Sequence, residues 1–172
     1  RLRAAGIAVD CLGSVARIPL TVDGADEVDP HLALIKGAGG AFLREKILAE
    51  AAEEVVIIVD QSKLVKQLGT KNPVPVEVLP VALSSVTARI GHLRASPVLR
   101  QGGGKAGPVI TDNGNFILDV TFQKIDDPAK LDSQLRAIPG VLETGLFTDQ
   151  ADVVYVGNDR GVSRLARSET RK

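Results

Sequence analysis

The sequence has few of the residues that build disulfide frameworks, metal centres and aromatic surfaces. Its 172 residues include one cysteine, two histidines, four phenylalanines and one tyrosine, and neither methionine nor tryptophan. The lone Cys11 excludes an internal disulfide and is typical of a reducing compartment, so we expect a cytoplasmic protein. With His31 and His92 as the only histidines, the usual ligands of a zinc site are also lacking.

Excess charge and long apolar runs are lacking too. The 21 lysines and arginines balance the 21 aspartates and glutamates, so no overall field attracts nucleic acid or an anionic membrane. The longest apolar run, Val55–Val59, is far too short to span a bilayer. We therefore expect a small-molecule ligand, and no nucleic-acid or membrane partner. Because the chain begins at Arg1 without any methionine, we expect its native start to lie further upstream.

The first half of the chain alternates apolar strands with helices, which predicts an α/β fold with a doubly wound, Rossmann-like parallel sheet. We expect three strands here, over residues 7–9, 18–22 and 55–59. Residues 41–52 have a helical spacing that places Leu43, Ile47 and Ala51 on one face. Residues 153–156 are apolar enough to return to this sheet, and the tail from Arg164 is polar and expected to fray. The Rossmann-like domain is thus expected over residues 1–70 and 150–172.

The remaining segment, residues 71–149, predicts a smaller α+β subdomain. Its prolines between residues 73 and 80 mark a crossing from the first domain. A helix near 82–93, a hairpin closed by Asn113-Gly114, a helix over 128–138 that begins at Asp127, and a strand over 141–147 then follow. We expect the hairpin arms at residues 109–111 and 116–120. The order β-α-β-β-α-β is typical of a split βαβ, ferredoxin-like unit.

Polar side chains follow two neighbouring strands of the expected sheet. Asp23 and Asp26 come after residues 18–22, and Lys63 comes shortly after residues 55–59. Between them lie Lys36, on a glycine-rich loop, and Glu45 in the helix that follows. Ligands of open α/β sheets bind at the carboxyl ends of the strands. A carboxylate there can take a proton from a carbon next to a carbonyl, while a lysine balances the resulting oxyanion. This set suits enediolate chemistry on a phosphorylated sugar.

Each of these features alone also has a simpler structural explanation. Asp23-Gly24-Ala25-Asp26 is sufficient for a turn, and Glu45 between Arg44 and Lys46 is typical of a solvated helix face. The loop over residues 36–40 has neither a P-loop nor a dinucleotide pattern. The aspartates 23, 26 and 29 lack calcium-loop spacing, so we expect no metal. Residues 102–105 favour a hairpin loop over a phosphate cradle, and Arg160, Arg164 and Arg167 favour a solvated surface.

Several motifs in register strongly resemble ribose-5-phosphate isomerase, type A. The resemblance covers almost the whole chain in the family's order. The matching runs are VDGADEV (22–28), LIKGAGGA (34–41), LREKI (43–47), DQSK (60–63), PVEVLP (75–80), TDNGN (111–115) and IPGV (138–141).

The resemblance implies interconversion of D-ribose 5-phosphate and D-ribulose 5-phosphate through a cis-enediolate, in the pentose phosphate pathway, without metal or cofactor. It implies that Glu45 moves the proton between C2 and C1, and that Asp23 assists ring opening and oxygen protonation. Lys36, with the main-chain N–H groups of residues 37–39, would stabilise the enediolate oxygen. The family also leads us to expect a homodimer or homotetramer.

The substrate-binding set implied by the resemblance extends beyond these catalytic residues. Asp26 would help to hold substrate hydroxyls, and Lys63 would lie near the phosphate. The full expected set is Asp23, Gly24, Ala25, Asp26, Lys36, Gly37, Ala38, Gly39 and Lys63. The motif often has glycine where this chain has Ala38, and a methyl group is compatible there if φ is negative.

One departure from the family pattern is larger. The family opens with a strand, a Gly-Thr-Gly-Ser-Thr-like phosphate loop and a helix, which this sequence does not contain. We therefore expect the 172 residues alone to be poorly stable and inactive.

Two other functions remain open on the same fold. A sugar-phosphate-sensing regulatory domain without turnover would keep the glycine loop but would not need Glu45. A CoA transferase would use a glutamate as a nucleophile that forms a thioester. The joint presence of both aspartates, both lysines and the glutamate favours the isomerase.

Overall fold

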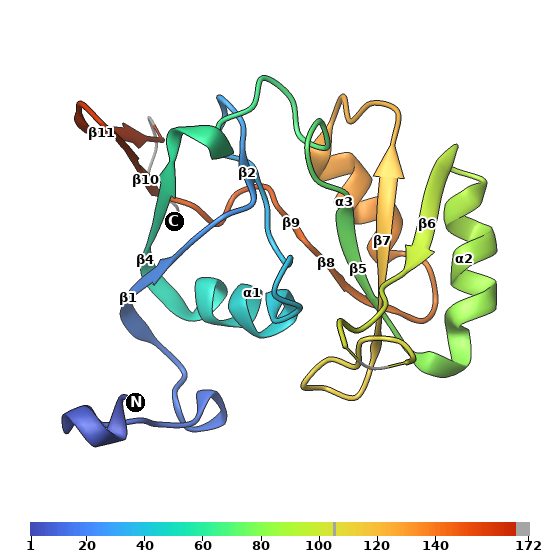
Figure 1. Ribbon diagram of the computed structural model, residues 1–172, viewed down its shortest axis with the longest axis horizontal. Helices are drawn as coiled ribbons and strands as arrows, with labels where there is room; N and C mark the ends of the chain where they lie inside the picture. Colours follow the sequence, from blue (N-terminus) through green and yellow to red (C-terminus); the bar gives the residue numbers. More distant parts are fainter. Residues whose placement is uncertain (105, 168–172) are drawn as a thin grey trace.

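The computed structural model describes residues 1–104 and 106–167 and contains three sheets (Figure 1). The main sheet has the order β1-β4-β10-β11, in which β1, β4 and β10 are parallel and β11 is antiparallel. Its strands are β1 (Ile18–Asp23), β4 (Ala52–Asp60), β10 (Val153–Asn158) and β11 (Gly161–Ala166). The expected strands over 18–22 and 55–59 are confirmed, and the second of them is central and parallel to both neighbours.

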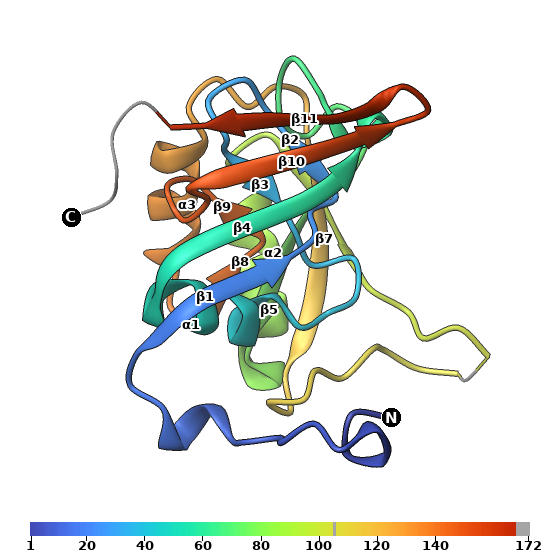
Figure 2. The same cartoon turned by 90° about the vertical axis from the view of Figure 1, so that its left-hand side faces the viewer.

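The two faces of the main sheet differ in burial. Val55, Ile57 and Val59 of β4 point into a core with helix α1 (Phe42–Ala51). On the opposite face, Ile58 is 56% exposed and Val22 is 55% exposed. Figure 2 shows this open face turned toward the viewer, with α1 behind the sheet. Apolar residues on both faces of β4 predict burial on both sides, and within the described residues only one side is covered.

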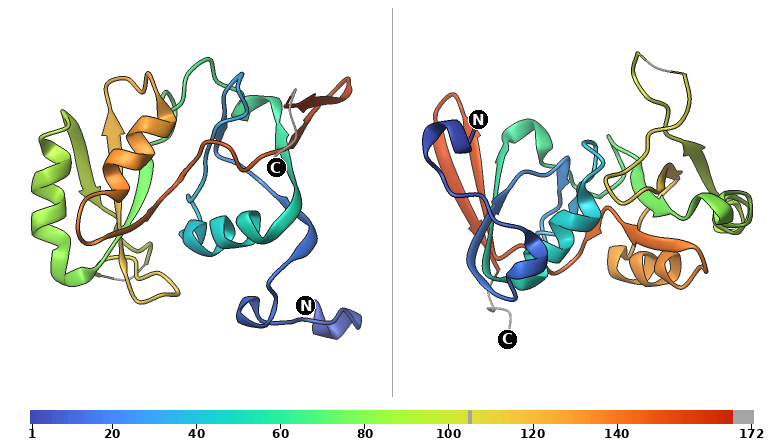
Figure 3. Two further views of the ribbon diagram at one scale, coloured as in Figure 1. Left: turned by 180° about the vertical axis from the view of Figure 1, so that it is seen from behind. Right: turned by 90° about the horizontal axis from the view of Figure 1, so that it is seen from below.

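The expected strand over residues 7–9 is not formed. Ile7 and Val9 lie in an exposed loop that follows a 3₁₀ turn, Arg3–Ala5, which ends at the left-handed Gly6. Residues 1–17 run away from the main sheet beyond β1 (Figure 3), so residues 7–9 have no neighbouring strand for their backbone groups. A second 3₁₀ turn covers Leu12–Ser14.

Helix α1 is where expected, but it buries a different face. Phe42, Lys46 and Ala49 are its buried residues, whereas Ile47 is 47% exposed. Lys46 can be buried because its ammonium group contacts Glu143 Oε1 at 2.8 Å and donates to two backbone carbonyls. The apolar spacing was misleading because a lysine occupies the middle of the buried face.

A short bridging sheet connects the main sheet region to the rest of the chain. Its strands are antiparallel, in the order β2 (Glu27–Val28), β3 (Leu34–Ile35) and β9 (Leu146–Phe147). The expected strand over 141–147 is therefore two strands. It breaks at Gly145, so that β8 (Val141–Thr144) and β9 belong to different sheets.

The small sheet has the order β6-β7-β5-β8 and is antiparallel throughout. Its other strands are β5 (Val74–Val78), β6 (Ala95–Leu99) and β7 (Phe116–Phe122), with helices α2 (Leu83–Gly91) and α3 (Pro128–Arg136). The order β-α-β-β-α-β is confirmed, and Asp127 caps α3 by accepting the Lys130 N–H at 2.9 Å. The second strand is β6, whereas residues 109–111 make only an isolated bridge to β7. Pro97 obscured β6, because proline is confined to edge strands such as this one.

The C-terminal segment is more ordered than its polarity suggests. Residues up to Ala166 pair with β10, and Arg167 donates to the carbonyls of Ala151 and Thr148 at 2.8 Å. Arg167 is thus not a solvated surface residue. Lys105 and the tail beyond residue 167 lie outside the described residues, and no helix within the described part is long and apolar enough to cross a membrane.

Candidate active site

Lys36 is the centre of a compact cluster of charged groups. Its side chain is only 5% exposed, and its Nζ lies 2.8 Å from Asp23 Oδ2 and 3.0 Å from Glu45 Oε2. The same Nζ donates to the carbonyl of Gly24 at 2.6 Å. A lysine ammonium has three N–H donors, so these contacts use all of them. Three side chains expected from the sequence to share a site are thus in direct contact.

Three elements of different kinds position these side chains. Asp23 is the last residue of β1 and pairs in register with Ile57 of β4. Lys36 follows β3, and Glu45 is in the first turn of α1. A carboxylate in the first turn of a helix is favoured by the helix dipole. The cluster therefore forms where the main sheet, the bridging sheet and α1 meet.

The glycine-rich loop is fixed next to this cluster by Asp26. Asp26 Oδ2 accepts the Ala38 N–H at 2.9 Å, and the Asp26 N–H donates to the Ile35 carbonyl at 2.8 Å. Gly37 has a φ of 111°, and a Cβ there would lie 2.6 Å from Phe42. Ala38 is not among the residues with positive φ, so its methyl group is compatible with the loop.

Lys63 lies at the carboxyl end of β4, in the 3₁₀ turn Gln61–Lys63, and not in the Lys36 cluster. Within the described residues it forms no ion pair with Asp23, Asp26 or Glu45. The hydrogen bonds of Ser62 lower the pKa of Asp60, and the charge of Lys63 adds to this effect. Lys63 is thus at the expected edge of the sheet, and Asp60 is the carboxylate that senses its charge.

The remaining expected binding residues also border the cluster or its loop. Gly24 is exposed and supplies the carbonyl that binds Lys36, and Ala25 is partly buried against the core of the main sheet. Gly39 is exposed at the tip of the loop.

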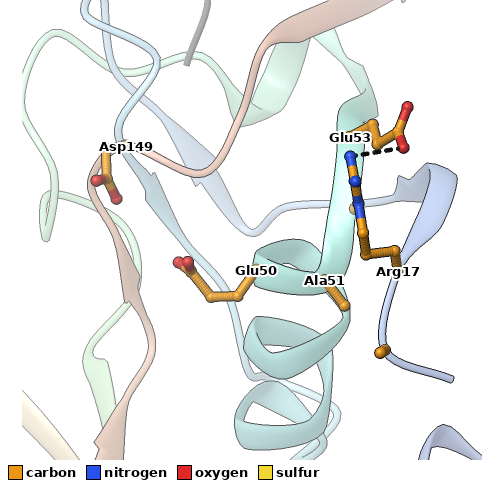
Figure 4. Close-up of a pocket in the computed structure, with 7 residues that line it drawn as sticks. Arg17, Glu50, Ala51, Glu53 and Asp149 are labelled. Carbon is orange, nitrogen blue, oxygen red and sulfur yellow. Dashed lines mark hydrogen bonds and ion pairs between the residues drawn. The ribbon is translucent and has the colours of Figure 1, made fainter. Parts of the chain in front are cut away.

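A larger hollow lies elsewhere on the surface. A cavity of about 640 Å³ is lined by Arg17, Glu50, Glu53 and Asp149 (Figure 4). Its Arg17–Glu53 ion pair, at 2.9 Å, joins two well-exposed side chains, a kind of contact that contributes little. The Asp23–Lys36–Glu45 cluster instead lines a narrow cavity closed by Phe147. No cluster of histidine, cysteine or acidic residues in the described ranges suits a metal ion.

Two residues near the cluster, Phe147 and Arg100, belong to none of the motifs found in the sequence. The ring of Phe147 lies 5.5 Å from the Nζ of Lys36 and 4.9 Å from that of Lys46, within the range of cation–π contacts. Arg100 forms an ion pair with Asp119 and also contacts the glycine-rich loop. An apolar or charged residue at these positions gives no signal in one sequence, because its neighbour lies far along the chain.

The family relationship follows from comparison with known proteins. The model of the family described as ribose 5-phosphate isomerase A (phosphoriboisomerase A) matches residues 1–161. The chain belongs to this family. It is 50% identical over 163 residues to the ribose-5-phosphate isomerase A of Thermococcus kodakarensis, covering 95% of this chain and 71% of that protein. The Pyrococcus furiosus enzyme is 49% identical over 162 residues, with 94% and 71% covered.

Solved structures of the family agree with the fold. A D-ribose-5-phosphate isomerase in complex with phospho-erythronic acid superposes with a TM-score of 0.93 at 47% identity, covering 96% of this chain and 72% of that one. The enzyme from Methanocaldococcus jannaschii gives a TM-score of 0.91 at 44% identity, with 96% and 73% covered. The expected Rossmann-like α/β fold with its α+β portion is thus confirmed for this family member.

Proposed function

We propose that the Asp23–Lys36–Glu45 cluster interconverts D-ribose 5-phosphate and D-ribulose 5-phosphate, the aldose–ketose isomerisation of the family to which the chain belongs. The observation that supports this proposal most directly is the position of the Lys36 Nζ within 3.0 Å of both carboxylates. Family membership favours an isomerase over a regulatory sensor or a CoA transferase.

Glu45 is the base in this mechanism. Its carboxylate takes the proton from C2 of the open-chain aldose, and the released electron pair forms the C1=C2 bond while the C1 carbonyl becomes an oxyanion. The oxygen of C1 then gains a proton and the hydroxyl of C2 loses one. Glu45 returns its proton to C1, which leaves the C2 ketone. Asp23 transfers protons on the oxygens and assists opening of the sugar ring.

Lys36 keeps the charge of the site balanced during the proton transfer. When Glu45 accepts the proton, it loses its negative charge, and that charge appears on the substrate oxygen. The ammonium group is already placed between its two carboxylates, so it can exchange its contact with Glu45 for one with the oxyanion. A charge fixed in place before the reaction stabilises the enediolate without reorganisation.

The substrate is held by groups around this cluster. Asp26 binds hydroxyls and holds the Ala38 N–H, and the N–H groups of Gly37 and Gly39 face the enediolate oxygen. Lys63 pairs with the phosphate at the carboxyl end of β4, where ligands of open α/β sheets bind. Gly24, Ala25 and Ala38 complete the wall of the site through their main chain.

The test is steady-state isomerisation by the complete polypeptide, with Glu45→Gln compared with wild type. The amide cannot accept the proton, so we expect kcat to fall about 10²–10⁴-fold. Glu53→Gln, which removes an exposed carboxylate paired with Arg17, is the matched control and should retain activity. Saturable binding of the sugar phosphate without turnover by the wild type would overturn the proposal and favour the sensor.

We propose a cytoplasmic homodimer or homotetramer in which residues 1–70 and 150–172 form the catalytic domain and residues 71–149 the small subdomain. Sedimentation equilibrium of the complete polypeptide tests the oligomeric state, and a monomer at micromolar concentration would contradict it.

A further inference from the structure

Arg100 connects the small sheet to the glycine-rich loop of the candidate site. It follows β6, and its side chain is 15% exposed. Its Nε donates to Asp119 Oδ2 at 2.8 Å, and its Nη2 lies 2.5 Å from Asp119 Oδ1, so the carboxylate holds the guanidinium by two bonds. The third nitrogen, Nη1, donates to the carbonyls of Gly37 at 2.8 Å and Ala38 at 3.1 Å.

These contacts fix the orientation of two successive peptide units. In a planar trans peptide the carbonyl and the following N–H point in opposite directions. Since Arg100 holds the carbonyl of Gly37, the N–H of Ala38 points away from it, toward Asp26 Oδ2 at 2.9 Å. The carbonyl of Ala38 is held in the same way, which sets the direction of the Gly39 N–H. Within the described ranges that N–H has no hydrogen-bond partner.

The loop needs such a restraint because of its composition. Three of the four residues over 37–40 are glycines, which can adopt many backbone conformations. The planar fork of an arginine can bind a carboxylate and two carbonyls at once, whereas a lysine ammonium acts as a point charge. A cation at the carbonyls also polarises the peptides and makes their N–H groups stronger donors.

We propose that Arg100, held by Asp119, is a positioning residue that keeps the 37–39 peptide units oriented so that the free Gly39 N–H faces the enediolate oxygen. Arg100 acts through the backbone of the loop and does not touch the substrate. This inference rests on the proposed isomerisation. It adds to the site a residue, Arg100, that is positioned by the small sheet. Removing the guanidinium should therefore affect the transition state more than substrate binding.

The experiment measures kcat, KM and inhibition by phospho-erythronic acid, the ligand of a related solved structure, for Arg100→Gln and Arg100→Lys in the complete polypeptide. The planar carboxylate of this inhibitor resembles the enediolate in shape and charge. Loss of one oxyanion donor costs about 10²–10³ in kcat, and misalignment of such donors should cost about 10- to 100-fold. We expect that loss in kcat for both variants, a KM within about threefold, and an inhibition constant that rises in parallel with the loss in kcat.

Arg44→Gln is the matched control. Arg44 also connects α1 to the loop before β7, through Asn113 Oδ1 at 2.9 Å and the Asp112 carbonyl at 2.8 Å, but among the described residues it has no hydrogen bond to the 37–40 loop. We expect the kcat of Arg44→Gln to stay within about twofold of wild type. That result would show that the loss of kcat in the Arg100 variants does not arise merely from breaking a contact with the small subdomain.

The inference would be overturned by an unchanged kcat in both Arg100 variants, by an equal loss in Arg44→Gln, or by binding of substrate and inhibitor that is weakened by the same factor. A loss of kcat that is fully explained by a lower folded fraction in thermal unfolding would also contradict it. Failure of the proposed function is distinguishable, because it would show as an inactive wild type or a fully active Glu45→Gln.

Discussion

Gly145 lies directly against the backbone of Lys36. The Lys36 N–H donates to the Gly145 carbonyl at 2.9 Å, and a Cβ on residue 145 would lie 2.2 Å from the Lys36 carbonyl oxygen. The Gly145 N–H in turn donates to the Pro75 carbonyl at 2.7 Å. The point where β8 gives way to β9 thus sets the position of the central lysine of the site.

Gly145→Ala should therefore disturb both stability and activity. The added methyl group meets backbone rather than a flexible side chain, so we expect a loss of about 1–3 kcal/mol in the free energy of unfolding. Urea unfolding measures that loss, and kcat should fall as Lys36 shifts. Gly13→Ala is the control, because nothing lies within 4 Å of its added Cβ. An alanine at position 145 with wild-type stability and kcat would contradict the close approach.

Lys46→Met tests the buried ion pair beneath α1. Lys46 contacts Glu143 at 2.8 Å, and Asp132 lies 3.7 Å from its Nζ. The methionine leaves Asp132 and Glu143 with the half-exposed Arg136, which lies 3.5 and 3.8 Å away, so we expect a loss of about 3 kcal/mol in unfolding free energy. The control Lys124→Met removes an exposed pair with Asp126 and should change stability by less than about 0.5 kcal/mol. Equal effects of the two substitutions in urea unfolding would show that the Lys46 pair is not buried.

Glu77 organises the loop before β7 from within the small sheet. Its fully buried Oε1 accepts hydrogen bonds from the Thr111 hydroxyl at 2.8 Å and from the amides of Asn113 and Asn115 at 3.0 and 2.8 Å. Glu77→Ala leaves these donors unpaired, so we expect a loss of about 3 kcal/mol or more. Glu77→Gln retains an acceptor and should cost less. Chemical denaturation of both variants checks this order, and the reverse order would refute the role of Oε1.

Acid stability should report on the turn after β4. The hydrogen bonds of Ser62, aided by the charge of Lys63, lower the pKa of Asp60 below the ordinary value of an aspartate. A carboxylate with a lowered pKa in the folded state stabilises the fold above its unfolded pKa, and this contribution is lost as the pH falls through the folded pKa. Ser62→Ala should therefore show a shallower decline of thermal stability below about pH 4. An unchanged decline would mean that the Ser62 hydroxyl does not lower the pKa of Asp60, because the backbone N–H that donates to Asp60 at 2.7 Å is retained in the variant.

The sequence predicts a structural feature well when that feature is determined by residues that are near neighbours in the chain. The run Val55–Val59 and the Asp127-Pro128 helix start were predicted correctly, because strand composition and capping act between near neighbours. The buried face of α1 was not, because burial of Lys46 depends on Glu143, far along the chain. The cluster of Asp23, Lys36 and Glu45 was predictable from the edge of the sheet where strands end in polar residues.

The positioning contacts were not predictable in the same way. Arg100 and Asp119 belong to no sequence motif. The hydrogen bonds from Arg100 to the carbonyls of residues 37 and 38 can form only once the small sheet has folded. The edge strand β6, which places Arg100 there, was not predicted from the sequence. Residues that act through tertiary contacts leave no pattern in a single sequence, whereas residues at strand ends do.

The central claim is that Glu45 moves a proton between C2 and C1 through an enediolate held by Lys36. The most direct test is isomerisation of ribose 5-phosphate in D₂O by the complete polypeptide, with the position of deuterium in the product read by NMR. An acidic Glu45 proton exchanges with solvent, so we predict that wild type forms ribulose 5-phosphate with deuterium at C1. Glu45→Gln should not form this deuterated product at a comparable rate. Full turnover without any deuterium in product or recovered substrate would contradict the account, because a proton held by the 27% exposed Glu45 carboxylate should exchange with solvent before it returns to C1.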